Sequence, residues 1–284
     1  MQTIEDAAAE GIAELRRDLS APSGVQARNR LLIIWAIRIG LLVILLGTWQ
    51  LTATEKWINP LFTSSPTEIW TALRQTAFAT ITQQLPTTLF EMAVGLSLGA
   101  VVGFLAGVVL SRLDVLNTAL RPLYVAANSL PRIALAPLFI IWFGLGVTSK
   151  IALSFTLVVF IVMINTLAGL TQVDRDFALL AKSMGITGFR RLKIFLLPAA
   201  VPMLAAAMEL GIVYSFLGVI TGELVGGSKG LGVQLAEEAT AFRTADFFAS
   251  LLILAIITTI FTQLMHLVAR RMLKWHYIEM RGIS

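Results

Sequence analysis

Long apolar stretches alternate with short polar segments along most of the chain. Six of these stretches approach or exceed the roughly 20 residues that a helix needs to cross a bilayer. We place them at residues 31–51, 88–110, 123–143, 151–170, 195–220 and 247–269. Because only helices and closed barrels satisfy their backbone groups within lipid, the pattern predicts an all-α polytopic membrane protein with about six transmembrane helices. A single transmembrane domain then covers residues 31–276.

The two ends of the chain lie outside this predicted domain. In residues 1–30, apolar side chains recur at helical spacing between Ile4 and Leu19. That pattern is compatible with an amphipathic helix at the membrane interface, and the polar composition is equally compatible with a cytoplasmic tail that has no fixed structure. Residues 277–284 form a short C-terminal tail, which we also expect in the cytoplasm.

A charged segment at residues 174–187 separates the fourth and fifth apolar stretches. It begins with Asp174-Arg175-Asp176, continues through Lys182 and reaches Gly185 near its end. Since it joins two predicted spans, it must lie outside the hydrocarbon, where a soluble protein can bind it. The segment therefore predicts a cytoplasmic helix that transmits force from a soluble partner to the spans.

Two local patterns predict how the second span is approached and packed. Ser65-Pro66-Thr67-Glu68 combines an N-cap, an early proline and a carboxylate at the third helical position, which predicts a short external helix from Pro66 toward Gln83, ending before Pro86. Glycines recur at every fourth position from Gly95 to Gly107. This spacing favours close packing against another helix over a role in solute binding.

Composition and charge support a membrane location. The chain has 57% hydrophobic and 14% charged residues, whereas soluble domains hold about 25% charged residues. The basic pI of 9.9 would also suit a nucleic-acid partner, but most lysines and arginines fall at the two ends and in the segments after the second and fourth spans. Cationic loops face the cytoplasm, so we expect both termini inside and no nucleic-acid partner. A multi-pass protein of the bacterial inner membrane fits these observations.

The sequence offers little for catalysis or for binding a cofactor. There are no cysteines, and the two histidines, His266 and His276, have no acidic residues at ligand spacing, so we expect no metal site and no enzyme activity in this chain. The turn from Gly226 to Gly232 looks like a phosphate loop, but its order is Ser-Lys-Gly where a nucleotide-binding loop has Gly-Lys-Ser/Thr. We expect no ATP there.

Four ionisable residues lie within predicted spans, where a charge is unfavourable unless something compensates it. Arg38 and Glu91 lie near span ends and should reach water there. Arg132 lies deeper and follows Pro131, one turn after Asn128 and Ser129. We expect a solute pathway at this kinked, polar stretch, with Glu209 pairing with Arg132 or contacting solute. The predicted pathway residues are Asn128, Ser129, Arg132, Glu209 and Tyr214.

Several motifs resemble one family of permeases. Ala181, Gly185 and Leu197-Pro198 match the spacing of the cytoplasmic EAA loop of ABC importer permeases, although Leu179-Leu180 stands where the family has Glu-Ala. The run from Asn128 to Lys150, together with the Lys229–Gly232 turn, resembles the nitrate/sulfonate/taurine branch. Relatives commonly carry arginine at the position of Glu209. The resemblance extends from about residue 57 to residue 276.

This resemblance implies a type I ABC importer permease that works by alternating access. Its partners would be a second permease copy, two ATP-binding subunits that carry ATP and Mg²⁺, an extracytoplasmic solute-binding protein and membrane lipid. The residues implied in ATPase coupling are Asp176, Leu179, Ala181, Lys182, Ser183, Gly185 and Pro198. Those implied in an external gate or in docking of the binding protein are Glu223, Lys229 and Gly230.

The solute and the class of transporter leave alternatives open. The resemblance implies a small anion such as a sulfonate, taurine, nitrate or bicarbonate, and related permeases also serve thiamine-pyrimidine precursors or aromatic carboxylates. An ion-coupled secondary transporter would also place charges near the middle of the membrane, but the chain shows no internal repeat. A membrane subunit without a solute path is a third hypothesis.

Overall fold

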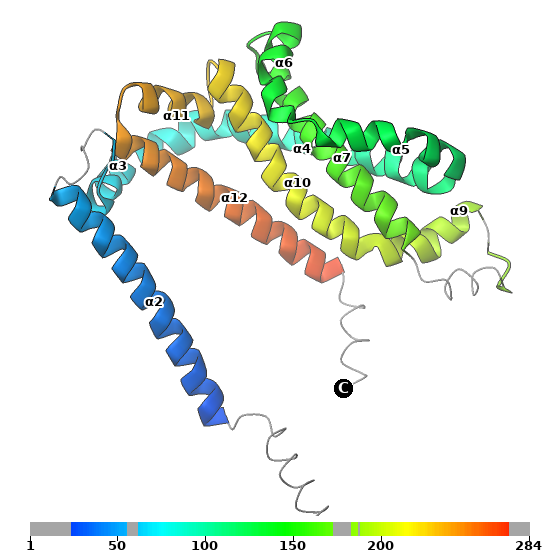
Figure 1. Cartoon of the computed structure of the whole chain (residues 1–284), viewed down its shortest axis with the longest axis horizontal. Coiled ribbons are helices and arrows are strands. Elements are labelled where there is room, and N and C mark those ends of the chain that lie inside the picture. The colour runs from blue at the N-terminus through cyan, green and yellow to red at the C-terminus, as the bar shows by residue number, and fades with distance from the viewer. Residues whose placement is uncertain (1–23, 56–61, 173–182, 187, 273–284) are drawn as a thin grey trace, which may run out of the picture. The chain divides into compact units, whose positions relative to one another are not determined.

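The computed structural model describes residues 24–55, 62–172, 183–186 and 188–272, and all regular elements in these ranges are helices (Figure 1). The chain divides into two units, Met1–Pro60 and Leu61–Ser284. The first unit contains α2 (Gly24–Thr54), an apolar helix of spanning length. The second contains α3 (Pro66–Ala79), α4 (Leu85–Arg112), α5 (Asp114–Ser129), α6 (Ala136–Phe143), α7 (Val147–Thr171), α9 (Gly188–Arg191), α10 (Leu197–Gly226), α11 (Leu231–Thr240) and α12 (Thr244–Met272).

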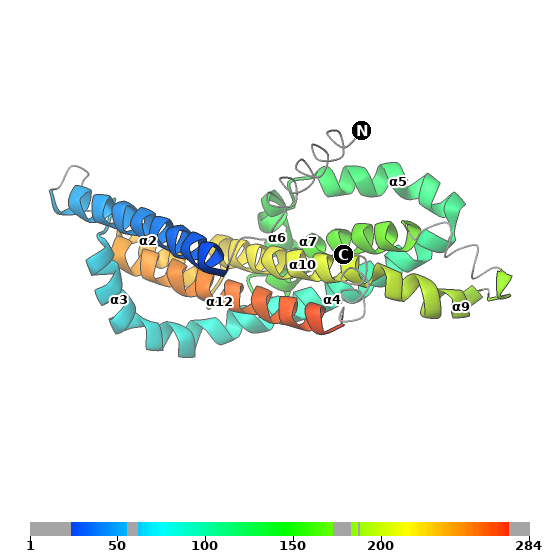
Figure 2. The ribbon, with the colours of Figure 1, turned by 90° about the horizontal axis from the view of Figure 1, so that it is seen from below.

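Helix α7 lies at the centre of the second unit, with α4 and α10 packed along it (Figures 1 and 2). The glycine stripe of α4 makes this packing possible: a Cβ at Gly99 would lie 2.7 Å from Cβ of Val158, and one at Gly107 would lie 2.6 Å from Cβ of Thr166. Real side chains do not approach so closely, so only glycine permits this helix separation. The predicted packing role of the stripe is confirmed.

Five helical segments in the described ranges are long and apolar enough to cross a membrane. They correspond to the first, second, fourth, fifth and sixth predicted spans. The third is different, because α5 and the helical segment Arg132–Phe143 are bent by 78° relative to each other. Our prediction of one helix over 123–143 was therefore wrong: the chain breaks at Leu130-Pro131, and helical structure already begins at Asp114, inside the expected loop.

The break follows from proline chemistry. Leu130 has φ −65° and ψ 136°, the extended conformation that a residue before proline prefers. Pro131 has no N–H to continue the helix, and the Arg132 amide instead bonds the Leu130 carbonyl at 2.8 Å. A short 3₁₀ turn at Arg132–Leu135 then leads into α6. This change of direction determines where Arg132 lies.

The outer helix α3 begins as predicted. The Glu68 amide donates to Oγ of Ser65 at 3.2 Å, and the Ser65 amide donates to the Glu68 carboxylate at 3.1 Å, which completes the capping box. Helix α3 also ends before Pro86, as predicted, but the chain stays helical beyond it. A π-helical segment, Thr80–Gln84, continues into α4, and Pro86 lies in the first turn of α4, where the missing N–H is tolerated.

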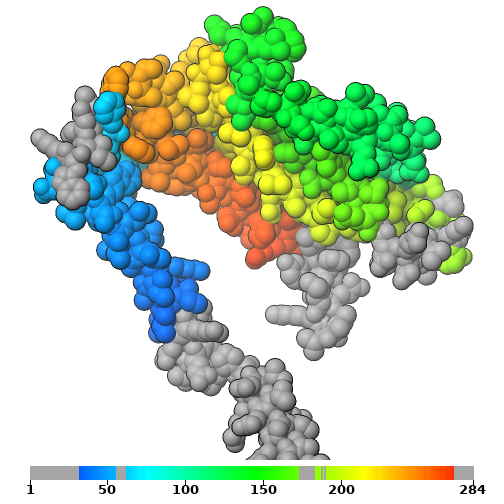
Figure 3. All heavy atoms as spheres, viewed as in Figure 1, coloured from blue at the N-terminus to red at the C-terminus, as the bar shows by residue number. Residues whose placement is uncertain are grey.

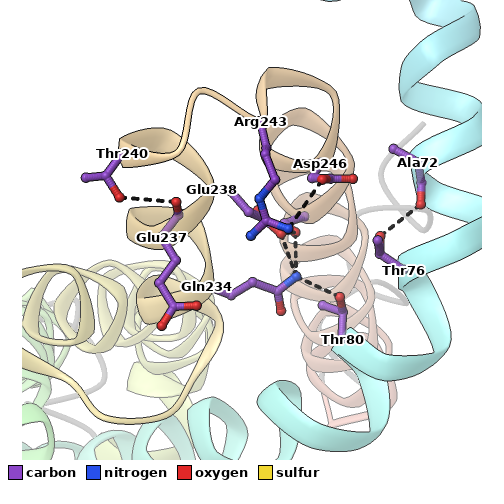
Figure 4. A network of polar contacts seen from close by, with 10 residues as sticks. Ala72, Thr76, Thr80, Gln234, Glu237, Glu238, Thr240, Arg243 and Asp246 are labelled. Atoms are coloured by element: carbon purple, nitrogen blue, oxygen red, sulfur yellow. Dashed lines mark hydrogen bonds and ion pairs between the residues drawn. The ribbon is translucent and has the colours of Figure 1, made fainter.

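A second π-helical segment, Leu192–Leu196, joins the short helix α9 to α10. At the other end of α10, a turn at residues 227–230 leads into α11, and α12 begins at Thr244. The helix that follows the glycine-rich turn is α11, Leu231–Thr240. Gln234 of α11 ties this helix to its neighbours through Nε2, which donates to Thr80, to Glu238 and to Ser250 of α12 (Figure 4).

Candidate functional site

The break between α5 and α6 holds a buried arginine. Arg132 is only 9% exposed, and its guanidinium donates to the Thr156 carbonyl of α7 at 2.5 Å and to Oδ1 of Asn128 at 2.5 Å. Its carbon Cζ also lies 4.7 Å from the centre of the Phe160 ring. These contacts compensate the buried charge and attach the broken segment to α7. Asn128 and Arg132 are therefore brought together, whereas Ser129 bonds back to its own helix.

The predicted pair between Arg132 and Glu209 does not form. Oε1 of Glu209 lies 2.7 Å from Nδ1 of His266, which joins α10 to α12. Sequence reasoning assigned no role to His266, although polar residues recur at helical spacing before it in the last span. Tyr214, the remaining predicted pathway residue, is 38% exposed on α10.

A buried charge cluster lies at the ends of α4, α7 and α10 that adjoin α11. Its members are Lys150, which is 2% exposed, and Glu91 and Glu223, which are each 1% exposed. The Lys150 ammonium donates to three carbonyls, those of Leu145, Gly146 and Gly226. Because these carbonyls belong to the α6–α7 turn and to the end of α10, Lys150 fixes the two chain segments to each other.

Glu91 belongs to this cluster, which corrects our expectation that it reaches water at the span end. Its carboxyl group is in hydrogen-bonding contact with that of Glu223 and feels the charge of Lys150. Its Oε2 atom has no hydrogen-bond partner within the described residues. Lys150, rather than solvent, supplies the opposite charge that offsets the burial of Glu91.

The outer turn at residues 227–232 wraps around the carboxylate of Glu223. That carboxylate accepts from the Thr88 hydroxyl at 2.8 Å and from the Gly232 amide at 2.7 Å. Gly230 has φ +128°, and a Cβ there would collide with the Glu223 carboxylate, so the turn requires glycine. Of the three predicted outer residues, Glu223 and Gly230 are buried and only Lys229 is exposed.

The predicted coupling segment is partly described. Asp176, Leu179, Ala181 and Lys182 lie outside the described residues. Ser183 and Gly185 are exposed, Gly185 has φ +67°, and no atom lies within 4 Å of the position that a Cβ would take there. Pro198 occupies the first turn of α10. Arg112, at the end of α4, donates to the Gly188 carbonyl at 3.2 Å, so this region contacts both α4 and α10.

Comparison with known proteins identifies relatives over most of the chain. Residues 99–274 match the family described as binding-protein-dependent transport system inner membrane component. A probable ABC transporter permease protein of Haemophilus influenzae is 33% identical over 218 residues, which cover 76% of this chain and 87% of that protein. The taurine transport system permease protein of Escherichia coli is 27% identical over 246 residues, covering 84% and 90%.

A third relative and one solved structure extend this picture. The formylaminopyrimidine transport permease protein of Halalkalibacterium halodurans is 28% identical over 215 residues, covering 76% of this chain and 86% of that protein. The inward-facing MetNI methionine ABC transporter contains a chain that superimposes with a TM-score of 0.60 at 20% identity, over 66% of this chain and 94% of its own length. The structural likeness shows a shared fold.

Proposed function

Because the chain belongs to the family of inner-membrane components of binding-protein-dependent transport systems, we propose that it lines the route of a small solute through an ATP-driven importer. Members of this family are permease subunits that work with ATPase subunits and a binding protein. The match over residues 99–274 carries this conclusion, since it includes α7, the cytoplasmic segment and α10. Family membership leaves the ion-coupled carrier and the subunit without a solute path unsupported.

The proposed mechanism is alternating access driven by separate ATPase subunits, which bind ATP and Mg²⁺ outside this chain. Two copies of the chain would form the pathway, and the segment 174–187 of each would dock on one ATPase subunit. Two observations support this role: Gly185 is exposed, and Arg112 of α4 bonds the carbonyl of Gly188, the residue that follows the segment. Coupling requires that the docked segment differ in its contacts between the two states.

The proposed orientation places both chain ends in the cytoplasm of a bacterium, with the protein spanning the inner membrane several times. The distribution of lysine and arginine supports this direction. Lys229 then lies on the outer face, where its exposed ammonium is available to an extracytoplasmic binding protein. Lipid surrounds the apolar faces of the spans.

For the solute, we propose first a small anion such as a sulfonate, taurine, nitrate or bicarbonate. Relatives include permease proteins named for taurine, aliphatic sulfonates and nitrate. The support for this class comes from these relatives, because the guanidinium of Arg132 is buried and bonds Asn128 and the Thr156 carbonyl. Glu209 supports a second class, solutes that carry N–H donors, since its carboxylate pairs with a histidine and not with Arg132. A relative named for formylaminopyrimidine belongs to that class.

The function is tested by reconstituting the chain with its partner ATPase and binding protein. Calorimetry of that binding protein against sulfonates, nitrate, bicarbonate, aromatic carboxylates and aminopyrimidines identifies the solute. Proteoliposomes that hold the complete complex should then accumulate this solute only when ATP is present on the cytoplasmic side. Accumulation that follows an ion gradient in the absence of ATP would contradict the proposed function.

A further inference from the structure

Helix α12 carries a polar stripe through an otherwise apolar span. Thr259, Thr262, Gln263 and His266 recur at intervals of three or four residues, so they lie on one face of the helix. Thr259 and Gln263 are exposed, and the side chain of His266 is 44% exposed. We call these four residues the α12 stripe. Four polar residues on one face are unexpected in a helix that is apolar enough to cross a membrane.

The stripe is distinct from the two apolar faces of the same helix. Leu254, Ile257, Phe261 and Met265 pack toward α10 and α4 in the core. On another side, Ile256, Ile260, Leu264 and Leu267 are each between 49% and 60% exposed, as expected for a surface in contact with lipid. The described elements leave a long part of α12 at the molecular surface (Figure 3). The stripe lies between the lipid-like face and the core face.

Glu209 of α10 extends this polar surface. It contacts His266 at 2.7 Å, and its side chain is 29% exposed. No other hydrogen bond or ion pair involves either residue among those the structure describes. An ionisable pair within a span is unfavourable against lipid and is retained where it faces water or a polar surface. The pair therefore indicates that the α12 stripe faces a water-filled space.

The side chains of this surface favour a solute that donates hydrogen bonds. The hydroxyls of Thr259 and Thr262 donate to carbonyls of their own helix, those of Ala255 at 2.7 Å and Thr258 at 2.9 Å. The remaining lone pairs of these hydroxyls can only accept, and the Glu209 carboxyl group adds further acceptor oxygens. The surface thus offers several oxygen acceptors beside the Gln263 amide and the His266 ring.

We propose that the α12 stripe and Glu209 form a water-exposed wall of the solute pathway that binds the cationic or N–H-donating part of the solute, such as an ammonium group or a ring N–H. The inference rests on the proposed transport function and specifies its substrate class. Of the solutes proposed above, taurine and the aminopyrimidines carry such a nitrogen donor, whereas nitrate and bicarbonate do not, so the inference narrows the proposed class to the former.

The absence of cysteine from the chain makes water access directly measurable. Single variants Thr259→Cys and Gln263→Cys on the stripe, and Leu264→Cys on the lipid-like face, are placed in the complete complex in lipid nanodiscs. Each is then treated with a cationic or an anionic methanethiosulfonate reagent. We expect the two stripe variants to react at least about tenfold faster than Leu264→Cys, because charged reagents do not enter hydrocarbon. Equal rates for all three, or disulfides between two copies at position 263, would overturn the water-exposed wall.

The binding preference is tested by the ratio of the two reagents. At Gln263→Cys the cationic reagent should react roughly fivefold faster or more than the anionic one, because Glu209 attracts it. Adding Glu209→Gln, whose amide can still bond His266, should bring this ratio of rates close to the ratio measured for free cysteine in solution. An unchanged ratio would overturn the assigned preference. These rates need no transport, so they remain interpretable if ATP-driven uptake, the test of the proposed function, fails.

Discussion

The hydroxyl of Thr88 in α4 donates to the carboxylate of Glu223 in α10 at 2.8 Å, and its oxygen accepts the amide of Leu231 at 2.9 Å. One buried threonine thus links the second predicted span, the end of the fifth and the start of α11. The outer turn keeps its shape through these polar bonds, since its glycines contribute no side-chain packing. Stability of this end of the molecule depends on the bonds being complete.

We predict that Thr88→Val destabilises the protein although valine has nearly the same shape. The change leaves the Leu231 amide without its partner and removes one bond from Glu223, which should cost about 1–3 kcal/mol. Thermal unfolding in detergent measures the effect. Thr71→Val is the matched control, because the exposed Thr71 hydroxyl bonds only its own helix at the Thr67 carbonyl. Equal melting temperatures for the two variants would contradict the prediction.

The glycine stripe of α4 makes a second prediction. A Cβ at Gly103 would lie 2.5 Å from the Val159 carbonyl oxygen, a backbone atom that cannot move aside easily. Gly103→Val should therefore force α4 and α7 apart and lower the free energy of unfolding by about 1–3 kcal/mol or more, the typical cost of overpacking. The yield of folded protein should fall strongly as a result. Size-exclusion chromatography reports the folded fraction. Gly47→Val in α2, where no atom lies within 4 Å of the added Cβ, should elute as the parent protein does.

Arg132 should be required for transport. Its bonds to Asn128 and to the Thr156 carbonyl fix the break between α5 and α6, and bonds to a charged group contribute about 1.5–3 kcal/mol each. We predict that Arg132→Gln lowers uptake of the identified solute by roughly tenfold or more, corresponding to about 1.4 kcal/mol. Arg121→Gln, which changes an exposed arginine of α5, should transport normally. Uptake is measured in proteoliposomes containing the complete complex.

Gly185 tests the coupling segment. At φ +67° a residue with a Cβ is strained by roughly 1–2 kcal/mol, whereas asparagine adopts this conformation more readily. We predict that Gly185→Trp uncouples solute-stimulated ATP hydrolysis from uptake, because its bulk changes the surface offered to the ATPase. Gly185→Asn should retain most activity. Full activity of the tryptophan variant would show that the segment does not dock where we propose.

The pH dependence of stability should depend on Glu238 in α11. Burial raises the pKa of this carboxyl above its ordinary value of 4.5, with Asp246 adding to the effect, while bonds from Gln234 and Ser250 and the charge of Arg243 oppose it. A raised pKa means that the folded state holds the proton more tightly, so stability falls as pH rises from about 4.5 toward the folded-state pKa. Glu238→Gln should flatten this decline in melting temperature. Glu237→Gln, at an exposed position, should leave it unchanged.

Hydrophobic patterning predicted most of the fold. Five predicted spans correspond to continuous spanning helices, and the Ser65–Glu68 motif predicted the start of α3. These features are local, because span length and capping are determined by neighbouring residues. The sequence also indicated a kink at Pro131, but a proline does not specify whether a helix bends slightly or breaks by 78°.

The charged side chains were harder to predict, because their partners lie far away in the sequence. Arg132 and Glu209 carry opposite charges within the membrane, yet the helices bring Glu209 to His266 instead. Glu91 lies near a span end, but packing encloses it with Lys150 and Glu223. Hydropathy records how apolar each position is and not which positions meet, so pairings that depend on tertiary packing cannot be read from it.

The π-helical segments at Thr80–Gln84 and Leu192–Leu196 determine which face of a short helix, α3 or α9, continues into which face of the following span, α4 or α10. A π-turn accommodates one residue more than an α-turn, and one residue corresponds to about 100° of rotation around a helix. Deleting a single residue from Leu192–Leu196 would thus rotate the preceding helix α9 about the helix axis, while α10 keeps its packing in the core. Single-residue insertions and deletions at these two places could redirect the peripheral helices without redesigning the spans.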